Sequence, residues 1–309
     1  MKMIKSLVLA GSLLAGCVRT DTAPSDDINA ALPTAEQVKI NLPQTATRSV
    51  GDLSSYYVVT RAATNTFNGG AAWVLTLIHT VVQFPVTSVS GNVYTWGPWT
   101  GDALDPAEYK LDVTDNGDGT YTYQFSGRNK TAGNGAAFES IISGTADPRA
   151  GELQGNGTFL LDLDASKRVD PIDNATNKGQ ITASYDLSAR TLALHIVSTN
   201  DDGSPVDATY NYQSDTSGGG NMTFDILGNA GGTALLEDMT VRSRWMSDGS
   251  GRGDARVTGG DLGSEAAIAS QCWGTDFRET YYTDNVNFLP TEGDPASCAF
   301  ATADLPAPR

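Results

Sequence analysis

The chain has little of what several common functions require. Its 20 Lys and Arg residues stand against 36 Asp and Glu residues, which gives a formal net charge of −16. Nucleic acids and anionic lipid surfaces are bound through clustered basic residues, and no such cluster is visible in the sequence. The two histidines, His79 and His195, lie far apart, and no Gly-x-Ser-x-Gly motif occurs. These shortages argue against a nucleic-acid-binding protein and against a Ser-His-Asp hydrolase.

Long apolar runs are also missing, apart from one short run at the N-terminus. Lys2 and Lys5 precede the apolar stretch 7–14, and small residues follow it. A basic start, a short apolar stretch and small residues are typical of a secretory signal. The sequence Leu-Ala-Gly-Cys at 14–17 resembles the lipobox of bacterial lipoproteins. The resemblance implies cleavage immediately before Cys17 and attachment of lipid to its sulfur.

The same resemblance predicts where the protein lies and how it is divided. We expect a signal peptide at 1–16, a lipidated cysteine with a polar tether at 17–49, and a single domain at 50–309. Val18 follows the cysteine, whereas the enteric sorting rule places Asp there in lipoproteins that stay at the inner membrane. We therefore expect a lipid anchor in the outer membrane, facing the periplasm or the cell surface. No later apolar run reaches the roughly 20 residues of a membrane helix, so the lipid alone is expected to contact the membrane.

The remaining two cysteines, Cys272 and Cys298, are expected to form a disulfide. An exported protein meets an oxidising compartment, where free thiols pair. The bond would close a loop of about 26 residues, which corresponds to about 3 kcal/mol of stabilisation. A cysteine-based metal site would need more ligands than two distant histidines supply. We therefore expect no metal ion and no cofactor.

Two segments near the N-terminus predict helices. Residues 53–67 favour a helix, although their Tyr-Tyr-Val-Val run is also typical of a strand. Residues 71–84 place their polar side chains at i, i+3, i+4 and i+7, so that the other faces of the helix are apolar. Such a helix is buried on most sides. Its residues Trp73, Leu77 and Val81 are the candidate contacts to a hydrophobic ligand.

From about Tyr94 onward the period of the apolar residues changes from 3.6 to 2. Runs of alternating apolar and polar residues are separated by turn signals such as Asn116–Gly119 and Gly218–Gly220. This pattern predicts a meander of about nine to eleven antiparallel strands with one polar face. We expect an α+β, mainly β fold: a long curved sheet, open barrel or half-barrel, covered or filled by the N-terminal helices. The segment 271–309 is less periodic, and the disulfide would hold it.

Two resemblances accompany this plan. The expected architecture of residues 50–260 is similar to that of Lol-type lipoprotein carriers, in which a curved sheet half-wraps helices around an apolar cavity. The stretches Trp96–Trp99, Tyr109–Gly127 and Gln271–Phe300 resemble a group of uncharacterised Gram-negative lipoproteins. The first resemblance implies a lipid-handling role by analogy of fold. The second implies a location and no particular activity.

Paired carboxylates offer one candidate chemistry. Asp162 and Asp164 are expected on the polar face of one strand, about 7 Å apart. That separation fits the two carboxylates of a glycosidase, and Trp96 and Trp99 would stack on sugar rings. A solvated face for the two aspartates and core packing for the two tryptophans are the plainer explanations.

Two further motifs have equally plain explanations. Asp112, Asp115 and the turn Asn116–Thr120 supply oxygens of the kind that calcium prefers, but a hairpin turn accounts for them fully. Arg252-Gly253-Asp254 spells the tripeptide that integrins read, which arises easily by chance in a Gly-rich acidic chain.

Three functions from different classes remain. The first is a non-enzymatic binding lipoprotein, whose apolar helix and one-sided sheet hold a hydrophobic ligand or the apolar segment of a protein partner. The second is a structural or assembly component of the outer membrane, which binds proteins through its polar sheet face, including Arg242 and Arg244. The third, less favoured, is a glycan-active enzyme. No residue is assigned a catalytic role.

Overall fold

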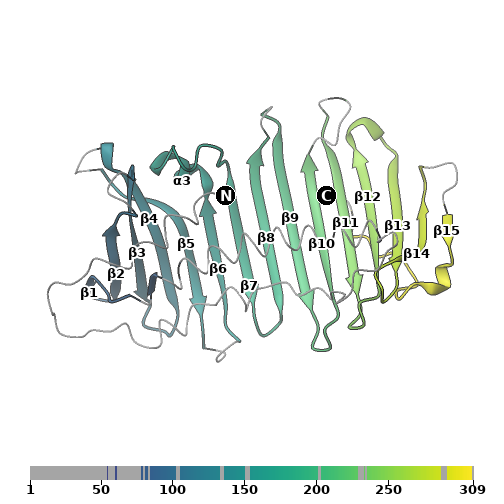
Figure 1. Cartoon of the computed structure of the whole chain (residues 1–309), viewed down its shortest axis with the longest axis horizontal. Helices are drawn as coiled ribbons and strands as arrows, with labels where there is room; N and C mark the ends of the chain where they lie inside the picture. The colour runs from purple at the N-terminus through teal and green to yellow at the C-terminus, as the bar shows by residue number, and fades with distance from the viewer. Residues whose placement is uncertain are drawn as a thin grey trace. The chain divides into compact units, whose positions relative to one another are not determined.

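The computed structural model describes the following residues: 84–101, 105–132, 136–149, 154–200, 203–228, 233, 235–286 and 291–307, with Ser54, Thr60, Ile78, Val81 and Val82. Within this part of the chain the fold is mainly β. Fifteen strands form an antiparallel sheet whose strand order follows the chain order, and the sheet is not closed (Figure 1). One α-helix, α3 (Leu163–Val169), has assigned bounds among these residues. The predicted antiparallel meander is therefore confirmed.

The chain divides into two compact units. The first contains residues 72–188 and the second residues 189–309, and each also includes part of the N-terminal 71 residues. The strands of the first unit are β1 (Ser88–Ser90), β2 (Val93–Trp99), β3 (Ala107–Asp115), β4 (Tyr121–Asn129), β5 (Glu139–Asp147), β6 (Asn156–Asp162) and β7 (Gln180–Asp186). The helix α3 lies between β6 and β7 and contacts β4, β5 and β7.

The buried face of the first unit is built from cross-strand neighbours. Leu111 on β3 lies opposite Phe125 on β4, and Phe125 lies opposite Ile142 on β5. Alternate residues point to the other face, where Thr145 and Thr158 share a hydrogen bond of 2.9 Å. One face is thus apolar and the other polar, as a period of two requires. Other buried members of the apolar face are Trp96, Val113, Tyr121, Tyr123, Ala146, Phe159, Leu161, Ala183 and Tyr185.

The second unit continues the same pattern. Its strands are β8 (Thr191–Thr199), β9 (Pro205–Ser214), β10 (Gly220–Gly228), β11 (Glu237–Trp245), β12 (Gly251–Gly259), β13 (Ala266–Trp273), β14 (Glu279–Asp284) and β15 (Thr291–Gly293). Tyr212, Met222 and Ser243 are register partners on β9, β10 and β11 and therefore share one face. This is the apolar face of the unit, and Tyr210 and Met222 are fully buried on it.

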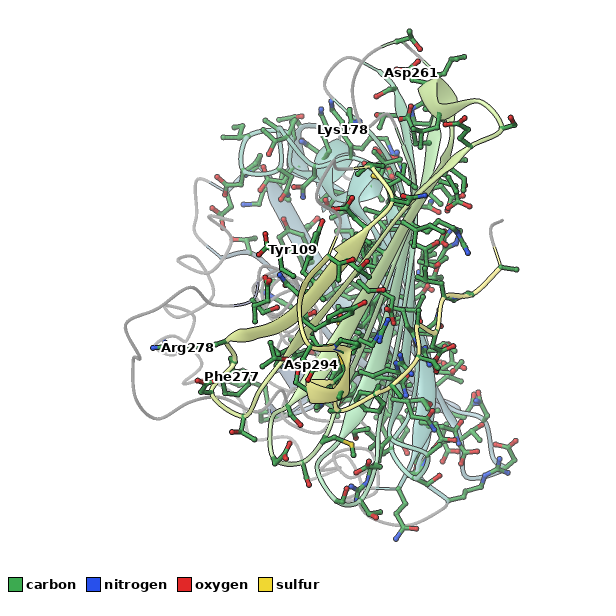
Figure 2. All side chains as sticks on the ribbon, turned by 90° about the vertical axis from the view of Figure 1, so that its right-hand side faces the viewer. Tyr109, Lys178, Asp261, Phe277, Arg278 and Asp294 are labelled. Atoms are coloured by element: carbon green, nitrogen blue, oxygen red, sulfur yellow. A yellow bond between two sulfur atoms is a disulfide. The ribbon has the colours of Figure 1, made fainter. Side chains whose placement is uncertain are left out.

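Two described residues from the N-terminal part of the second unit contact this apolar face. Thr60 shares a hydrogen bond of 2.6 Å with Ser243 on β11. The hydroxyl of Ser54 donates to Gln271 on β13 at 2.5 Å, and its backbone N–H donates to the carbonyl oxygen of Phe277. Phe277 lies in the turn that joins β13 and β14 (Figure 2). Both N-terminal side chains are buried, so this face is covered where they bind.

The predicted helices 53–67 and 71–84 lie largely outside the described residues. Thr60, Ile78, Val81 and Val82 are described, have helical backbone and are buried. These positions agree with the predicted helices. That two helices cover or fill the sheet remains a prediction.

Two features of the predicted meander are wrong. The strand count of about nine to eleven is too low, because β13, β14 and β15 continue the sheet through the segment that appeared less periodic. The run around Leu161 also does not continue as a strand through Asp164. It ends at Asp162, whose side chain caps the first turn of α3 by accepting the backbone N–H of Ala165 at 2.7 Å. An N-terminal cap of this kind stabilises a helix by about 1 kcal/mol, which favours α3 over a longer strand.

Candidate functional site

A network of polar contacts surrounds an arginine cluster on β11 and β12. Arg242, Arg244, Arg252 and Arg256 lie on the polar face of the second unit, opposite to the face that Ser54 and Thr60 contact. Arg244 and Arg252 are direct register partners. Like charges directly opposite on neighbouring strands are destabilising unless other groups compensate them. We call these four side chains the arginine face.

One buried carboxylate compensates part of this charge. Asp254 has no exposed side-chain surface and accepts from Arg252 Nε at 2.8 Å, Arg244 Nη2 at 3.1 Å and Ser270 Oγ at 2.6 Å. A fourth hydrogen bond of 3.2 Å comes from the backbone N–H of Asp304. Each carboxylate oxygen thus accepts two hydrogen bonds, so burial of the charge is matched by full pairing.

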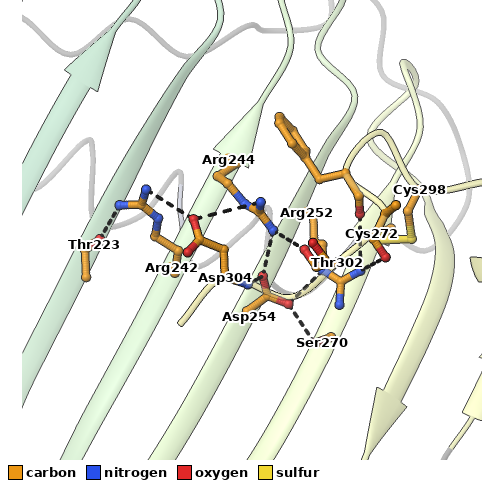
Figure 3. A network of polar contacts seen from close by, with 12 residues as sticks. Thr223, Arg242, Arg244, Arg252, Asp254, Ser270, Cys272, Cys298, Thr302 and Asp304 are labelled. Carbon is orange, nitrogen blue, oxygen red and sulfur yellow. Dashed lines mark hydrogen bonds and ion pairs between the residues drawn. A yellow bond between two sulfur atoms is a disulfide. The ribbon is translucent and has the colours of Figure 1, made fainter. Parts of the chain in front are cut away.

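The last described residues of the chain, 298–307, cross the arginine face with bends at 299–302, and we call them the C-terminal strap (Figure 3). Backbone carbonyl oxygens of the strap accept hydrogen bonds from three arginines. Arg244 Nη2 donates to the carbonyl oxygen of Thr302 at 2.6 Å, and Arg252 Nη1 donates to that of Phe300 at 3.2 Å. Arg256 donates to the carbonyl oxygen of Pro306. The strap is therefore held by peptide groups along its length.

The strap also contributes a ring and a carboxylate. The guanidinium of Arg244 lies over the ring of Phe300 at 4.8 Å from its centroid, a cation–π geometry. Asp304 Oδ2 lies 3.4 Å from Arg242 Nη2 and 3.9 Å from Arg244 Nη1. Both separations are longer than a charge-assisted hydrogen bond. Asp304 is also half exposed, so it pairs only loosely with the arginines.

Cys272 and Cys298 tie the start of the strap to the sheet. Their Cα atoms lie 5.4 Å apart and their sulfur atoms lie at disulfide distance, as the sequence predicts. Cys272 lies opposite Arg252 in the register of β12 and β13. The disulfide therefore places the start of residues 299–307 beside the arginine face.

The carboxylates proposed for glycan chemistry have structural roles instead. Asp162 caps α3 and also accepts from Gln180 Nε2 at 3.1 Å. Asp164 lies in the first turn of α3 and accepts the backbone N–H of Gly179 at 3.1 Å. They do not share the face of one strand, because the strand ends at Asp162. The prediction that placed them there is wrong, and the glycosidase pairing loses its basis.

The tryptophans pack as the plainer explanation predicts. Trp96 is buried, and its indole N–H donates to the carbonyl oxygen of Phe84 at 2.8 Å. Trp99 packs against Phe125 at 6.0 Å between ring centroids. Neither is arranged as an open platform for sugar rings, although Trp99 remains half-buried.

The turn considered for calcium uses its oxygens internally. Asp115 Oδ1 accepts the backbone N–H of Gly117, and Asp118 Oδ1 accepts both the backbone N–H and the hydroxyl of Thr120. These bonds to Thr120 lower the pKa of Asp118. In the part of the chain that the structure describes, no group of three or more His, Cys, Asp or Glu side chains is arranged to hold a metal ion.

The other residues named from the sequence fall in two groups. His195 lies exposed on β8, with Nε2 3.1 Å from Asp207 Oδ1, in keeping with a surface role. Val81 is described and buried. The predicted lipid-attachment residue and the remaining candidates lie outside the described residues; these are Cys17, Trp73, Leu77 and His79.

Sequence reasoning named Arg242 and Arg244 but missed the cluster to which they belong. The signal was present: arginines at 242 and 244, and at 252 and 256, have the even spacing that places side chains on one face of a strand. A short Met-Ser-Asp-Gly-Ser link, residues 246–250, joins the two strands and sets these pairs side by side. The Arg-Gly-Asp tripeptide lies inside this cluster on β12, with Arg252 and Asp254 buried.

Comparison with protein-family models, curated proteins and solved structures finds no significant match to this chain. The two resemblances named from the sequence therefore gain no support from these comparisons. Among the described residues, no helix combines the length and apolar character needed to span a membrane.

Proposed function

We propose that the chain is a lipid-anchored lipoprotein of the bacterial outer membrane that binds a protein partner through the arginine face, without catalysing a reaction. The observation that carries the proposal is that this face binds a peptide segment without regular secondary structure, residues 300–306, through backbone carbonyl oxygens and a carboxylate. A surface that already binds one polypeptide by groups common to all polypeptides is suited to bind another.

The charge distribution supports this proposal. The chain is strongly acidic, with a net charge of −16, yet four of its 20 basic residues lie on two adjacent strands. Arg guanidinium groups recognise carboxylates and are enriched at protein interfaces. Concentrating them on one face of an otherwise acidic protein gives that face a distinct affinity for acidic segments.

Binding of a hydrophobic ligand has less support. Ile78 and Val82 are at most 1% exposed, and Val81 is 7% exposed. Side chains this buried fill space in the core, whereas a ligand cavity needs apolar surface left free. Val81, the described one of the three residues singled out for ligand contact, is therefore better suited to packing.

Site-specific photocrosslinking in intact bacteria tests the partner proposal. A photoreactive residue at Asn221, which lies in the register row of Arg244, is expected to capture one reproducible protein. The adduct should be lost when Arg242 and Arg244 are both changed to Gln. A probe at Thr158, an exposed position on the polar face of β6, is the matched control and should capture nothing at that mass. Adducts that persist in the double variant would contradict the proposal.

Replacement of Cys17 by Ser tests the anchor. The variant is expected in the soluble fraction of lysed cells, whereas the wild-type chain sediments with the outer membrane, because the lipid alone is proposed to hold it there. Circular dichroism of the released variant should show the same β content. A Cys17→Ser chain that still sediments with membranes would refute the lipid anchor.

A further inference from the structure

The C-terminal strap leaves two hydrogen-bond donors of the arginine face without a partner among the described residues. The Nε atoms of Arg242 and Arg244 are buried and make no hydrogen bond with any described residue. The carboxylate of Asp304 approaches both guanidinium groups at 3.4 and 3.9 Å, without the short paired bonds that a carboxylate and a guanidinium form when well aligned. Burying an N–H donor without a partner costs free energy, which a better ligand would recover.

We propose that the arginine face is a binding site for an acidic segment of the partner protein, and that the C-terminal strap occupies this site until the partner segment displaces it. This inference rests on the proposed function and adds the chemistry of the partner. The partner segment presents carbonyl oxygens to Arg244, Arg252 and Arg256, as the strap does. It also presents a carboxylate that reaches Arg242 and Arg244 more closely than Asp304 does.

The geometry of the strap explains how exchange would occur. The disulfide fixes the strap at Cys298, while its outer residues 301–304 are exposed to solvent. Residues 299–307 can therefore leave the face while their attachment to β13 remains intact. A tethered segment competes at an effective concentration in the millimolar range for short linkers, so it masks the site until a better ligand arrives.

A peptide-binding measurement on the full chain tests the inference. The protein carries Cys17→Ser for solubility, and the probe is a fluorescein-labelled peptide with the sequence of residues 299–307 and an amidated end. In fluorescence anisotropy, the peptide should bind the Asp304→Asn chain about two- to fivefold more tightly than the chain with an intact strap, the range expected for an exposed ion pair. The reason is that Asp304→Asn removes the only strap carboxylate that pairs with Arg242 and Arg244 among the described contacts.

Matched variants separate charge recognition from unspecific adhesion. A peptide in which Asp304 is Asn should bind about two- to fivefold more weakly. Adding Arg242→Gln and Arg244→Gln to the Asp304→Asn chain should abolish binding. Phe300→Ala, which removes the ring over Arg244, is a second way to loosen the strap and should also raise peptide affinity.

Three outcomes would overturn the inference. The first is no binding of the peptide to either loosened chain, with circular dichroism showing that both are folded. The second is equal binding of the Asp and Asn peptides. The third is a doubled mass of the Asp304→Asn chain in sedimentation, which would make a second copy the occupant. If the peptide binds as expected but crosslinking at Asn221 captures no partner, the proposed function fails while the site stands.

Discussion

At the scale of single residues, this sheet depends on close contacts between particular neighbours, some of them polar and some apolar. Asp254 is the polar example, since two arginines, a serine hydroxyl and a strap amide converge on its two oxygens. Glycine and aromatic partners are the apolar example. Trp245 lies over Gly220, where a Cβ atom would come within 2.8 Å of the indole ring.

We expect Asp254→Ala to lower the free energy of unfolding by about 3–5 kcal/mol, because it leaves Arg244 and Arg252 buried without their counter-ion. Urea unfolding followed by circular dichroism measures this change. Glu139→Ala is the control: its ion pair with Arg168 is short, at 2.8 Å, but half exposed. The control should cost about 0–1 kcal/mol. Equal losses in the two variants would show that Asp254 is not the centre of the network.

Gly144 tests the glycine–aromatic pairs. A Cβ atom at this position would overlap the hydroxyl group of Tyr123 and the carbonyl oxygen of Thr158. We expect Gly144→Ala to cost about 1–3 kcal/mol in unfolding free energy, since both the backbone of β6 at Thr158 and the buried ring of Tyr123 must move. Gly228→Ala, whose nearest neighbour would be Ile226 at 3.5 Å, should change stability by about 0.5 kcal/mol or less. A neutral Gly144→Ala variant would mean that the ring has room to shift.

At the scale of elements, the sequence predicts strands well and their ends poorly. Alternation such as Tyr121, Tyr123 and Phe125 indicates a strand because a half-buried sheet requires period two. Alternation alone did not reveal that the run through Leu161 stops at Asp162. The signal was a capping Asp followed by a helix-forming stretch that ends in Lys167 and Arg168, and local capping chemistry decided the structure there.

Turn aspartates are the other element-scale feature, and Asp147 at the end of β5 shows it most clearly. Its carboxylate accepts hydrogen bonds from the guanidinium of Arg149 at 2.8 and 2.6 Å and from the backbone N–H of Arg149 at 3.1 Å. These bonds lower the pKa of Asp147 from 3.8 to about 2. A carboxyl group whose pKa is lower in the folded state stabilises the fold above its unfolded pKa and loses that contribution as pH falls through its folded pKa.

The lowered pKa of Asp147 predicts how the stability of the Asp147→Asn variant depends on pH. The wild-type protein should be more stable than the variant by a constant amount above about pH 5, and the difference should shrink between about pH 4 and pH 2. Urea unfolding of both proteins across this range measures the difference. The contrary result would be a difference that stays constant down to pH 2, which would mean that the charge of Asp147 does not act in the folded state.

At the scale of the whole molecule, the sequence predicts the fold class more completely than it predicts the candidate site. The mainly β meander follows from a repeated local pattern, so the sequence predicts it directly. The arginine face follows only in part. The even spacing of the arginines indicates a shared face on each strand, but only the register of β11 and β12 sets Arg244 beside Arg252, and the strap that crosses them returns from residues 298–307. A pairing across 50 residues, such as that of Asp254 and Asp304, has no local signature.

The disulfide holds the start of the strap at the sheet, and removing the bond tests how much it contributes to holding the strap on the arginine face. Changing Cys272 and Cys298 together to Ala removes a cross-link between residues 26 apart and should lower the free energy of unfolding by about 3 kcal/mol. Hydrogen exchange should also become faster at the amide of Asp304, which bonds to Asp254. The wild-type protein under reducing conditions is the matched control and should behave like the double variant. If stability falls but this amide stays protected, the hydrogen bonds of the arginines hold the strap without the disulfide, and a partner must compete with those bonds directly.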